Sequence, residues 1–392
     1  MMPGCCTASG FSTIMRDSMK QVYLNKTDCS GCTACSHMCP EEAITMEPDQ
    51  EGFLYPVINQ DLCSGCGCCT EICSFTHHQN LKNKGSQACF SCISKEETVL
   101  KASTSGGAFT ALSDSILDQG GVVYGADFDE EFKVYHSRAV TKTERDRQRV
   151  SKYAQSNLHQ VFHQVEADLN EGRRVLFTGT PCQIAGLKSC IPESLAENLI
   201  LCDLICHSVP SPLIWKEYKE WLERKYSGKL SKVMFRSKIH PWTRENSNRG
   251  FLFELEEEPD ILHEDDRFYD LFFKAGTIAR PSCENCKFTD RNRVGDITIA
   301  DYWGIEEYSP ETYTPLGVSV VLINNQKGKS LLREMMQKAD MVQRSIEESL
   351  THQQRLSQPV KYPAWRKKFW EELENLGFDF IMEKYATQWN ET

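Results

Sequence analysis

The sequence predicts a small, cysteine-rich α+β domain followed by an α/β domain with a mainly parallel sheet, an antiparallel insertion and C-terminal helices. Two observations predict this order. Of the 19 cysteines in the 392-residue chain, 11 lie within the first 73 residues. Behind them, short apolar runs alternate with helical patterns, which is typical of parallel strands joined by helices.

Charge and hydropathy narrow the class of protein. The chain carries 44 Lys and Arg against 55 Asp and Glu, a net charge of −11, so nucleic acid is not an expected partner, because phosphate contacts need clustered basic residues. No apolar run approaches the roughly 18 residues that cross a bilayer, so no membrane span is expected. The N-terminus lacks a secretory pattern. We therefore expect a cytoplasmic protein, with an organellar matrix as the alternative, in which cysteines bind metal rather than form disulfides.

Two cysteine runs of the same spacing, C-x2-C-x2-C-x3-C, repeat at an offset of 34 residues. In this pattern three thiolates of one run and the fourth thiolate of the other run hold each 4Fe-4S cluster. The two predicted ligand sets are Cys29, Cys32, Cys35 and Cys73, and Cys63, Cys66, Cys69 and Cys39. Structural zinc is the alternative, but it usually uses two C-x2-C pairs separated by a loop.

Residues 20–76 thus resemble a bacterial-type two-cluster ferredoxin domain, with a ferredoxin-like α+β fold. Residues 1–19, with Cys5 and Cys6, are expected to form a flexible tail, and residues 77–101 a linker with a short ordered piece. Cys68 is expected to pack rather than to bind metal, as are Cys89 and Cys92. Two neighbouring clusters form an electron relay, so we expect the chemistry to come from the rest of the chain.

Residues 102–325 are expected to form the α/β domain. A Ser/Gly loop over 103–107 leads into a helix over 108–118 and a strand over 122–127. A hydroxyl-rich loop at a helix N-terminus favours a phosphate, with a simply capped helix as the alternative. The region has no GxGxxG sequence, which argues against an ordinary dinucleotide site.

Two further strands, over 174–177 and 198–205, each lead through a loop into a helix, over 184–189 and 213–225. Loops at the carboxyl ends of parallel strands form the ligand crevice, so Cys182 and Cys206 on these loops are expected to face one site. Cys283 and Cys286 form a C-x2-C pair and bring the thiols available for a third cluster to four. Cys190 and Cys202 are expected to be core residues.

The remaining segments complete the predicted fold. A helix with apolar residues from Leu158 to Leu169 precedes the second strand. Alternating segments over 233–236 and 251–256 predict the antiparallel insertion. Residues 326–392 are expected to be a helical segment, with amphipathic helices over 329–339, 343–350 and 365–376 that pack on the sheet or at a homo-oligomer contact.

Several motifs resemble those of the coenzyme F-420 hydrogenase/dehydrogenase beta-subunit family, over roughly residues 85–385. They are Ser105-Gly106-Gly107, Ser151-Lys152-Tyr153 with Ser156, Gly179-Thr180-Pro181-Cys182-Gln183, Cys206-His207 with Pro210-Ser211-Pro212, Arg280-Pro281-Ser282-Cys283 with Cys286, and Asp296 through Gly304. Members bind a flavin, usually FAD, and one 4Fe-4S cluster in this domain, and many also carry the two-cluster module. Ala300 and Ser208 stand where many relatives have glycine, which bears on substrate fit.

The resemblance implies ligands for both groups. The third cluster would be held by Cys182, Cys206, Cys283 and Cys286. The flavin, FAD rather than FMN, would contact Thr104, Ser105, Gly106, Gly107, Lys152, Tyr153, Ser156, Thr178, Gly179, Thr180 and Gln183.

The expected function is that of an iron–sulfur flavoprotein oxidoreductase. Ferredoxin or another redox subunit would exchange electrons with the N-terminal clusters, and the flavin would exchange hydride with a small organic substrate or a deazaflavin-type coenzyme. Lys152 is expected to stabilise the reduced flavin, and His207 and Asp301 to donate protons. The alternatives are a non-catalytic electron-transfer subunit of a larger redox complex, and a scaffold or metal-storage module.

Overall fold

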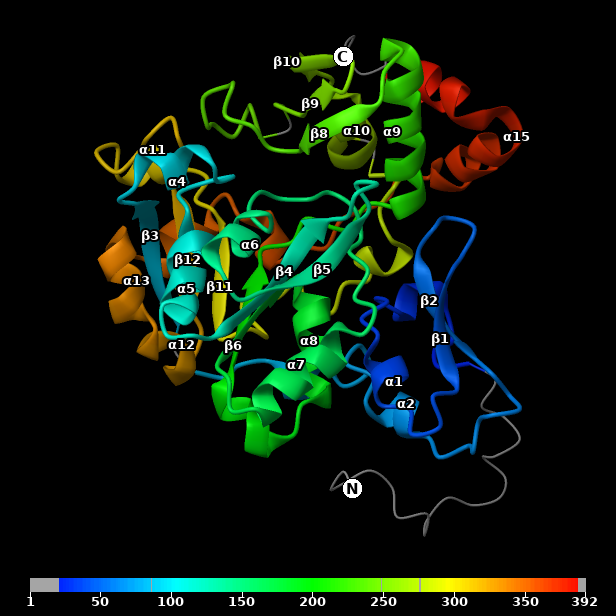
Figure 1. The fold of residues 1–392 in the computed structure, drawn as a ribbon, viewed down its shortest axis with the longest axis horizontal. Coiled ribbons are helices and arrows are strands. Elements are labelled where there is room, and N and C mark those ends of the chain that lie inside the picture. Colours follow the sequence, from blue (N-terminus) through cyan, green and yellow to red (C-terminus); the bar gives the residue numbers. More distant parts are fainter. Residues whose placement is uncertain (1–20, 86, 248, 275, 387–392) are drawn as a thin grey trace.

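The computed structural model describes residues 21–85, 87–247, 249–274 and 276–386. The tail expected over residues 1–19, with Cys5 and Cys6, lies outside these residues. Figure 1 shows three parts: a small N-terminal unit, a large sheet flanked by helices, and a smaller sheet with two long helices at one end. None of the described helices is long and apolar enough to span a bilayer.

The N-terminal unit is built twice from the same pieces. Each cysteine run enters a one-turn helix through a left-handed residue, Thr33 (φ 66°) before α1 (Ala34–His37) and Gly67 (φ 81°) before α2 (Cys68–Glu71). An antiparallel hairpin of β1 (Ile44–Pro48) and β2 (Leu54–Ile58) covers the cysteines from one side. A 3₁₀ turn (Lys26–Asp28) precedes the first run, and α3 (His78–Leu81) follows the second. The internal repeat expected from the sequence is therefore a repeat of structure.

The large sheet has eight strands in the order β13-β3-β12-β11-β7-β6-β4-β5. Their bounds are β3 (Ala88–Ser94), β4 (Val122–Phe128), β5 (Val134–Ala139), β6 (Val175–Gly179), β7 (Leu199–Leu204), β11 (Ile297–Asp301), β12 (Ser319–Ile323) and β13 (Ala339–Arg344). The central strands β4, β6, β7 and β11 are parallel, and antiparallel strands complete both edges. The expected fold class is confirmed.

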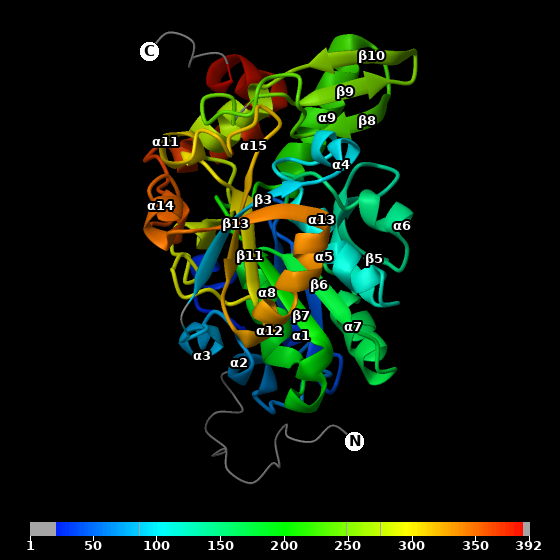
Figure 2. The same ribbon diagram turned by 90° about the vertical axis from the view of Figure 1, so that its left-hand side faces the viewer.

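Helices cover both faces of this sheet (Figure 2). One face packs against α5 (Ala108–Leu117), α12 (Gln326–Ser330) and α13 (Leu332–Lys338), through residues such as Leu112, Ile116 and Met335. The other face packs against α7 (Val161–Asn170) and α8 (Pro181–Cys190), through residues such as Phe162, Val165 and Ile184. Ala34 and Phe75 of the N-terminal unit join this second core, so the unit docks on the α7–α8 face.

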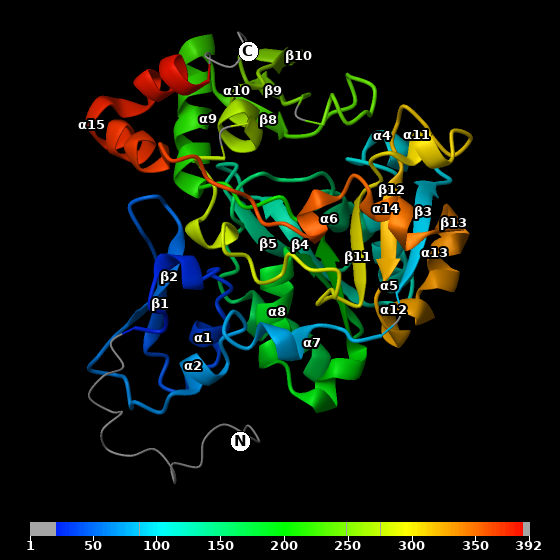
Figure 3. The same ribbon diagram turned by 180° about the vertical axis from the view of Figure 1, so that it is seen from behind.

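The smaller sheet is the expected antiparallel insertion. It contains β8 (Leu230–Met234), β9 (Leu252–Leu255) and β10 (Glu258–Glu264). It shares an aromatic core with α9 (Pro212–Tyr226) and α15 (Arg366–Tyr385), which is kinked at Gly377 (φ 81°). Figure 3 shows α15 beside α9 at the end of the molecule. The short connecting helices are α4 (Glu97–Lys101), α6 (Lys142–Asp146), α10 (Arg267–Tyr269), α11 (Ile305–Tyr308) and α14 (Ile346–Leu350), with 3₁₀ turns at Glu193–Asn198, Pro281–Cys283 and Gln354–Leu356 and a π-helix at Asp270–Lys274.

Two segments differ from their sequence expectation. The region expected to be a linker contains β3, which pairs with β12 and β13 inside the large sheet. Its Ser and Cys residues make the strand weakly apolar although it is almost wholly buried. The expected helices over 329–339 and 343–350 are wrong between them, because residues 339–344 form β13. Pairing with the exposed edge of β3 decides the conformation of a segment with no strong periodicity of its own.

Candidate iron–sulfur and cofactor sites

The first predicted cysteine set lies around one cavity. Cys29, Cys32, Cys35 and Cys73 line it, together with apolar residues that include Met46, Pro56 and Phe75. Ser74, which stands where the first run has proline, places its Oγ 3.5 Å from Cys32 Sγ. The structure thus brings one thiol of the second run to three thiols of the first, as the spacing predicts.

The second set lines another cavity. Cys39, Cys63, Cys66 and Cys69 surround it, with Pro40, Ile44 and Ile58 as apolar walls. Cys68 also lines this cavity and is buried, so the sequence alone does not separate it from the four predicted ligands. Its expected role in packing stays a prediction.

Burial makes these thiols poor anions unless a cation accompanies them. It raises the pKa of Cys29 to about 11 against the opposing effect of Arg280, and together with neighbouring thiols it raises the pKa of Cys69 to about 11. Burial also raises the pKa of Cys35 well above its usual value. Iron supplies the positive charge that such thiolates need. Four converging thiols in an apolar cavity therefore fit a 4Fe-4S cluster in each position.

Arg280 reaches from the α/β domain into the first set. Its Nε donates to the Cys29 carbonyl (2.9 Å), and its two terminal nitrogens donate to Gln155 Oε1 (2.7 Å) and the Leu54 carbonyl (2.9 Å). One of them also lies 3.9 Å from Cys29 Sγ. The Arg280 side chain is buried, with the residue only 1% exposed. Sequence reasoning did not assign Arg280 a role, and its adjacency to Cys283 was the available signal.

The third predicted set is assembled at the carboxyl ends of β6 and β7. Cys182 begins α8, Cys206 follows β7, and Cys283 ends a 3₁₀ turn three residues before Cys286. Burial, together with the nearby thiols of Cys283, Cys182 and Cys286, raises the pKa of Cys206 well above its usual value. Burial and the Cys286 and Cys182 thiols likewise raise the pKa of Cys283 to about 12. The four side chains are close enough to interact, which makes them a fitting ligand set.

The third set adjoins the first. Helix α8 carries Cys182 in its first turn, and at Gly186 it lies against Cys32, so closely that a Cβ at Gly186 would be 2.9 Å from Cys32 Sγ. Burial raises the pKa of Cys182 to about 12, and the Cys32 thiol contributes to this rise. The second set adjoins the first from the other direction, since Cys69 is among the thiols that raise the pKa of Cys35. The three sets therefore lie in the order second, first, third.

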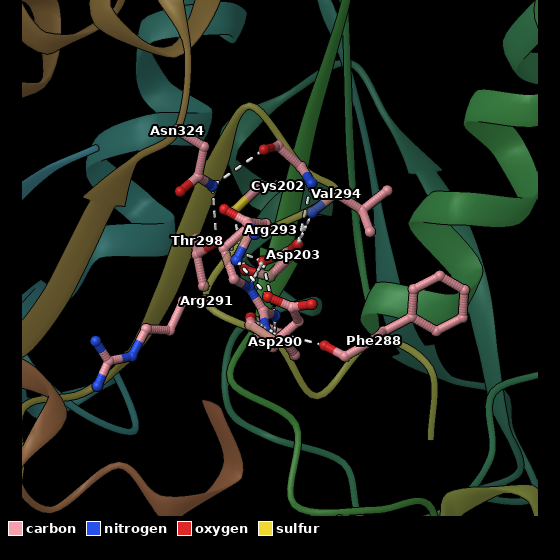
Figure 4. A network of polar contacts seen from close by, with 12 residues as sticks. Cys202, Asp203, Phe288, Asp290, Arg291, Arg293, Val294, Thr298 and Asn324 are labelled. Atoms are coloured by element: carbon pink, nitrogen blue, oxygen red, sulfur yellow. Dashed lines mark hydrogen bonds and ion pairs between the residues drawn. The ribbon is translucent and has the colours of Figure 1, made fainter. Parts of the chain in front are cut away.

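A buried polar network fixes the chain between Cys286 and β11 (Figure 4). Arg293 forms an ion pair with Asp203 (3.1 Å) and donates to the Leu204 carbonyl (2.8 Å). The other carboxylate oxygen of Asp203 accepts from the amides of Val294 and Gly295. This network ties the segment that carries Cys286 to the strand that carries Cys206.

The loop assigned by resemblance to the flavin is packed against the sheet. Ser105 Oγ donates to the Val318 carbonyl (2.7 Å), and the Gly106 amide donates to Ser319 Oγ (2.9 Å). A Cβ at Gly106 would lie 2.0 Å from the Cys92 carbonyl oxygen. This loop anchors the start of α5 to β12 and β3. Gly107, the next residue, is left-handed (φ 88°) and begins the helix.

The other expected flavin neighbours lie near the carboxyl ends of β4 and β6 and use their polar groups internally. Thr104 Oγ1 accepts from the Ser151 amide (3.0 Å), Ser156 Oγ lies 2.6 Å from His136 Nδ1, Thr178 Oγ1 donates to the Tyr124 carbonyl (3.0 Å), and the Thr180 amide donates to Gln183 Oε1 (3.0 Å) beside Gly179. Thr180 caps α8 in this way.

Lys152 turns its ammonium inward. The Nζ donates to the carbonyls of Arg149 (2.8 Å) and Val150 (3.3 Å) and lies 5.5 Å from the centre of the Phe128 ring. Burial lowers the pKa of Lys152 to about 8. The loop's own backbone therefore holds this ammonium, and its role beside a flavin stays a prediction.

Asp301 and Tyr153 are joined by Arg236, which sequence reasoning missed. Arg236 lies 3.2 Å from Tyr153 Oη and 3.5 Å from Asp301 Oδ2, while the other Asp301 oxygen accepts from Trp242 Nε1 (2.8 Å). Lys238 donates to the carbonyls of Ser105 (2.9 Å) and Leu316. Neither cation belongs to a recognisable motif, because both come from the insertion.

The stacked rings of Trp242 and Trp303, 4.6 Å apart, flank these groups. His207 lies apart from them, edge-on to Phe272 and Phe273. Burial, with the Arg355 charge nearby, lowers the pKa of His207 to about 4, so the imidazole is neutral near pH 7. The three expected catalytic residues are thus not gathered at one point.

Comparison with known proteins identifies two matching family models. Residues 172–349 match the model for the C terminus of the coenzyme F420 hydrogenase/dehydrogenase beta subunit, and residues 28–76 match the 4Fe-4S dicluster domain. No curated protein matches the chain. Among solved structures, a chain of the F420-reducing NiFe hydrogenase complex from Methanosarcina barkeri is similar at 18% identity, with a TM-score of 0.46, over 79% of this chain and 94% of that chain.

Proposed function

Residues 172–349 belong to the coenzyme F420 hydrogenase/dehydrogenase beta-subunit family and residues 28–76 to the 4Fe-4S dicluster domains, and on this premise we propose an iron–sulfur flavoprotein oxidoreductase. Three 4Fe-4S clusters would connect a redox partner to an FAD, which exchanges hydride with a small organic substrate or a deazaflavin-type coenzyme. The clusters pass single electrons, whereas a flavin stores two and releases them as a hydride. The close approach of Cys32 and α8 is the observation that carries this proposal, because it links the dicluster unit to the α/β domain.

The order of the cysteine sets supports a direction for the relay. The second set adjoins an exposed surface that includes Pro40, Glu41 and Glu42, whereas the third set is enclosed by the α/β domain. The partner, ferredoxin or another redox subunit, would therefore exchange electrons at the second set. Acidic side chains there favour a partner with a basic docking surface. Two successive single-electron transfers supply the electron pair of one hydride.

Arg236 and Lys238 support the flavin end of the proposal. They place two partly or fully buried cations beside Ser105 and Asp301, next to the stacked rings of Trp242 and Trp303. An anionic, aromatic ligand matches such surroundings, because cations attract its phosphates and flat side chains its ring. In this assignment the Ser105–Gly107 loop shapes the site through its backbone, and Asp301 orients Arg236.

Cofactor counting after anaerobic purification tests the proposal. We expect about twelve irons and one FAD per chain, since each cubane contributes four irons. Cys182→Ser should remove about four irons, whereas the matched change Cys190→Ser, in a buried core thiol on the same helix, should remove none. Zinc in place of iron, or equal losses in both variants, would contradict the assignment.

A non-catalytic electron-transfer subunit is the second candidate. It is favoured by the internal hydrogen bonds of Ser105, Gly106 and Lys152, which occupy groups that a flavin would otherwise contact. In that case the purified chain would hold about twelve irons without flavin. Its clusters would be reduced by ferredoxin, and no turnover would occur without a partner subunit.

A further inference from the structure

One cluster of metal-ligating side chains lies outside the three cysteine sets. It joins His37, on α1 between the predicted ligands Cys35 and Cys39, to His163 and Glu166 on α7. His163 and Glu166 are three positions apart, which places them on the same side of the helix. One ligand atom from each of the three residues lies within 4.8 Å of the other two.

His37 has a buried nitrogen that is not satisfied by the protein. Its side chain is 3% exposed, its Nε2 lies 3.5 Å from Glu166 Oε2, and its Nδ1 has no hydrogen-bond partner among the described residues. The His163 ring stands 4.2 Å from the His37 ring, tilted by 53°. Buried polar atoms are nearly always satisfied, so an orphaned imidazole nitrogen indicates a missing ligand.

We propose that His37, His163 and Glu166 bind a divalent transition-metal ion, of which Zn²⁺ is the representative. Two imidazoles and one carboxylate form a ligand set that suits zinc and leaves a coordination position for water. His163 is exposed, so the ion has access from solvent. The set contains no thiol, which separates it chemically from the iron–sulfur positions.

Such an ion would fasten two parts of the chain to one another. Helix α7 is anchored to the large sheet through Val161, Phe162, Val165 and Leu169. Helix α1 belongs to the dicluster unit, whose first cysteine run contains His37. An ion bound only by the folded arrangement stabilises it by mass action, so zinc should raise the melting temperature of the whole chain.

The test uses the full chain, reconstituted anaerobically with iron and sulfide, treated with a chelator, and dialysed against zinc sulfate. We expect the wild type to retain roughly one zinc per chain, in a set of nitrogen and oxygen ligands at about 2.0–2.1 Å by X-ray absorption. His163→Ala and Glu166→Gln should lose this ion and the zinc-dependent rise in melting temperature, with iron content unchanged. Both positions lie on the outer side of a helix, so the variants should fold.

His159→Asn provides the matched control, because His159 is an exposed histidine four positions before His163. Its backbone is left-handed (φ 39°), a conformation that asparagine accepts. This variant should keep the ion. Zinc retained by both His163→Ala and Glu166→Gln, or zinc bound by sulfur at about 2.3 Å with a matching loss of iron, would overturn the proposal.

Discussion

Asp203 and Arg293 form an ion pair from which solvent is excluded, with side chains 0% and 1% exposed. Asp203 lies on β7, three residues before Cys206, and Arg293 lies seven residues after Cys286. The carboxylate also accepts from Thr298 Oγ1 (2.5 Å) on the neighbouring strand β11. Every oxygen of Asp203 is therefore occupied, and this pair fixes the distance between two halves of the third cysteine set.

Asp203→Asn should destabilise the chain strongly. The change leaves the Arg293 guanidinium buried without a counter-charge, which costs about 3–5 kcal/mol in comparable sites. We expect a lower midpoint of urea unfolding under anaerobic conditions, and loss of iron from the third set before the other two. Glu97→Gln, which breaks the exposed Glu97–Lys101 pair on α4, should change the midpoint little. Similar midpoints for the two variants would contradict the importance of burial.

The sequence was most informative where spacing alone fixes chemistry. The two cysteine runs predicted both sets that line cavities, because ligand spacing is local and repeats. Strand β3 was not predicted, since its Ser and Cys residues hide a buried strand that only pairing with β12 and β13 explains. Arg236 and Arg280 were not predicted as site residues either. Each acts at a position distant in sequence, and a solvated arginine has the same local pattern.

Arg280 should raise the reduction potential of the cluster in the first set. Its charge lies 3.9 Å from Cys29 Sγ, and a nearby positive charge stabilises the more negative, reduced cluster. Arg280→Gln should therefore lower that potential, by roughly tens of millivolts. Redox titration followed by electron paramagnetic resonance measures the effect.

Two further variants separate charge from structure at this position. Arg280→Lys keeps the charge but loses part of the hydrogen bonding, so it should restore most of the potential. Arg291→Gln removes a charge from an exposed loop in the same part of the chain and should leave the potential unchanged. A potential that falls equally in the Lys and Gln variants would assign the effect to positioning of Cys29 rather than to charge.

Lys238 should make stability depend on pH in the alkaline range. Burial lowers its pKa to about 8 in the folded chain, partly against Asp301 and with help from Arg236, while the unfolded value is 10.5. Between these values the unfolded state binds more protons, so the free energy of unfolding gains from Lys238 as pH rises. The stabilisation is complete above about pH 10.5 and is lost as pH falls to about 8.

Urea unfolding of Lys238→Met and the wild type at several pH values isolates this contribution. Relative to the variant, the wild type should gain at most about 1.4 kcal/mol per pH unit between pH 8 and 10. Lys232→Met, in an exposed lysine of β8, should show no such relative gain. A constant difference between wild type and Lys238→Met across the range would show that the Lys238 ammonium stays charged.

Gly186 should be essential for the contact between the first and third cysteine sets. A Cβ at this position of α8 would lie 2.8 Å from Cys32 Cβ and 2.9 Å from Cys32 Sγ, so Gly186→Ala must displace Cys32 or the helix. Alanine favours helix by about 1 kcal/mol over glycine, so any loss arises from the contact and not from the helix itself. We expect loss of about four irons, or slower passage of electrons from the first set to the third, measured by iron counting and stopped-flow reduction. Gly120→Ala, where a Cβ would meet no atom within 4 Å, controls for backbone strain and should retain full iron content and rate. Unchanged iron and unchanged rate in Gly186→Ala would mean that electrons do not cross between Cys32 and α8.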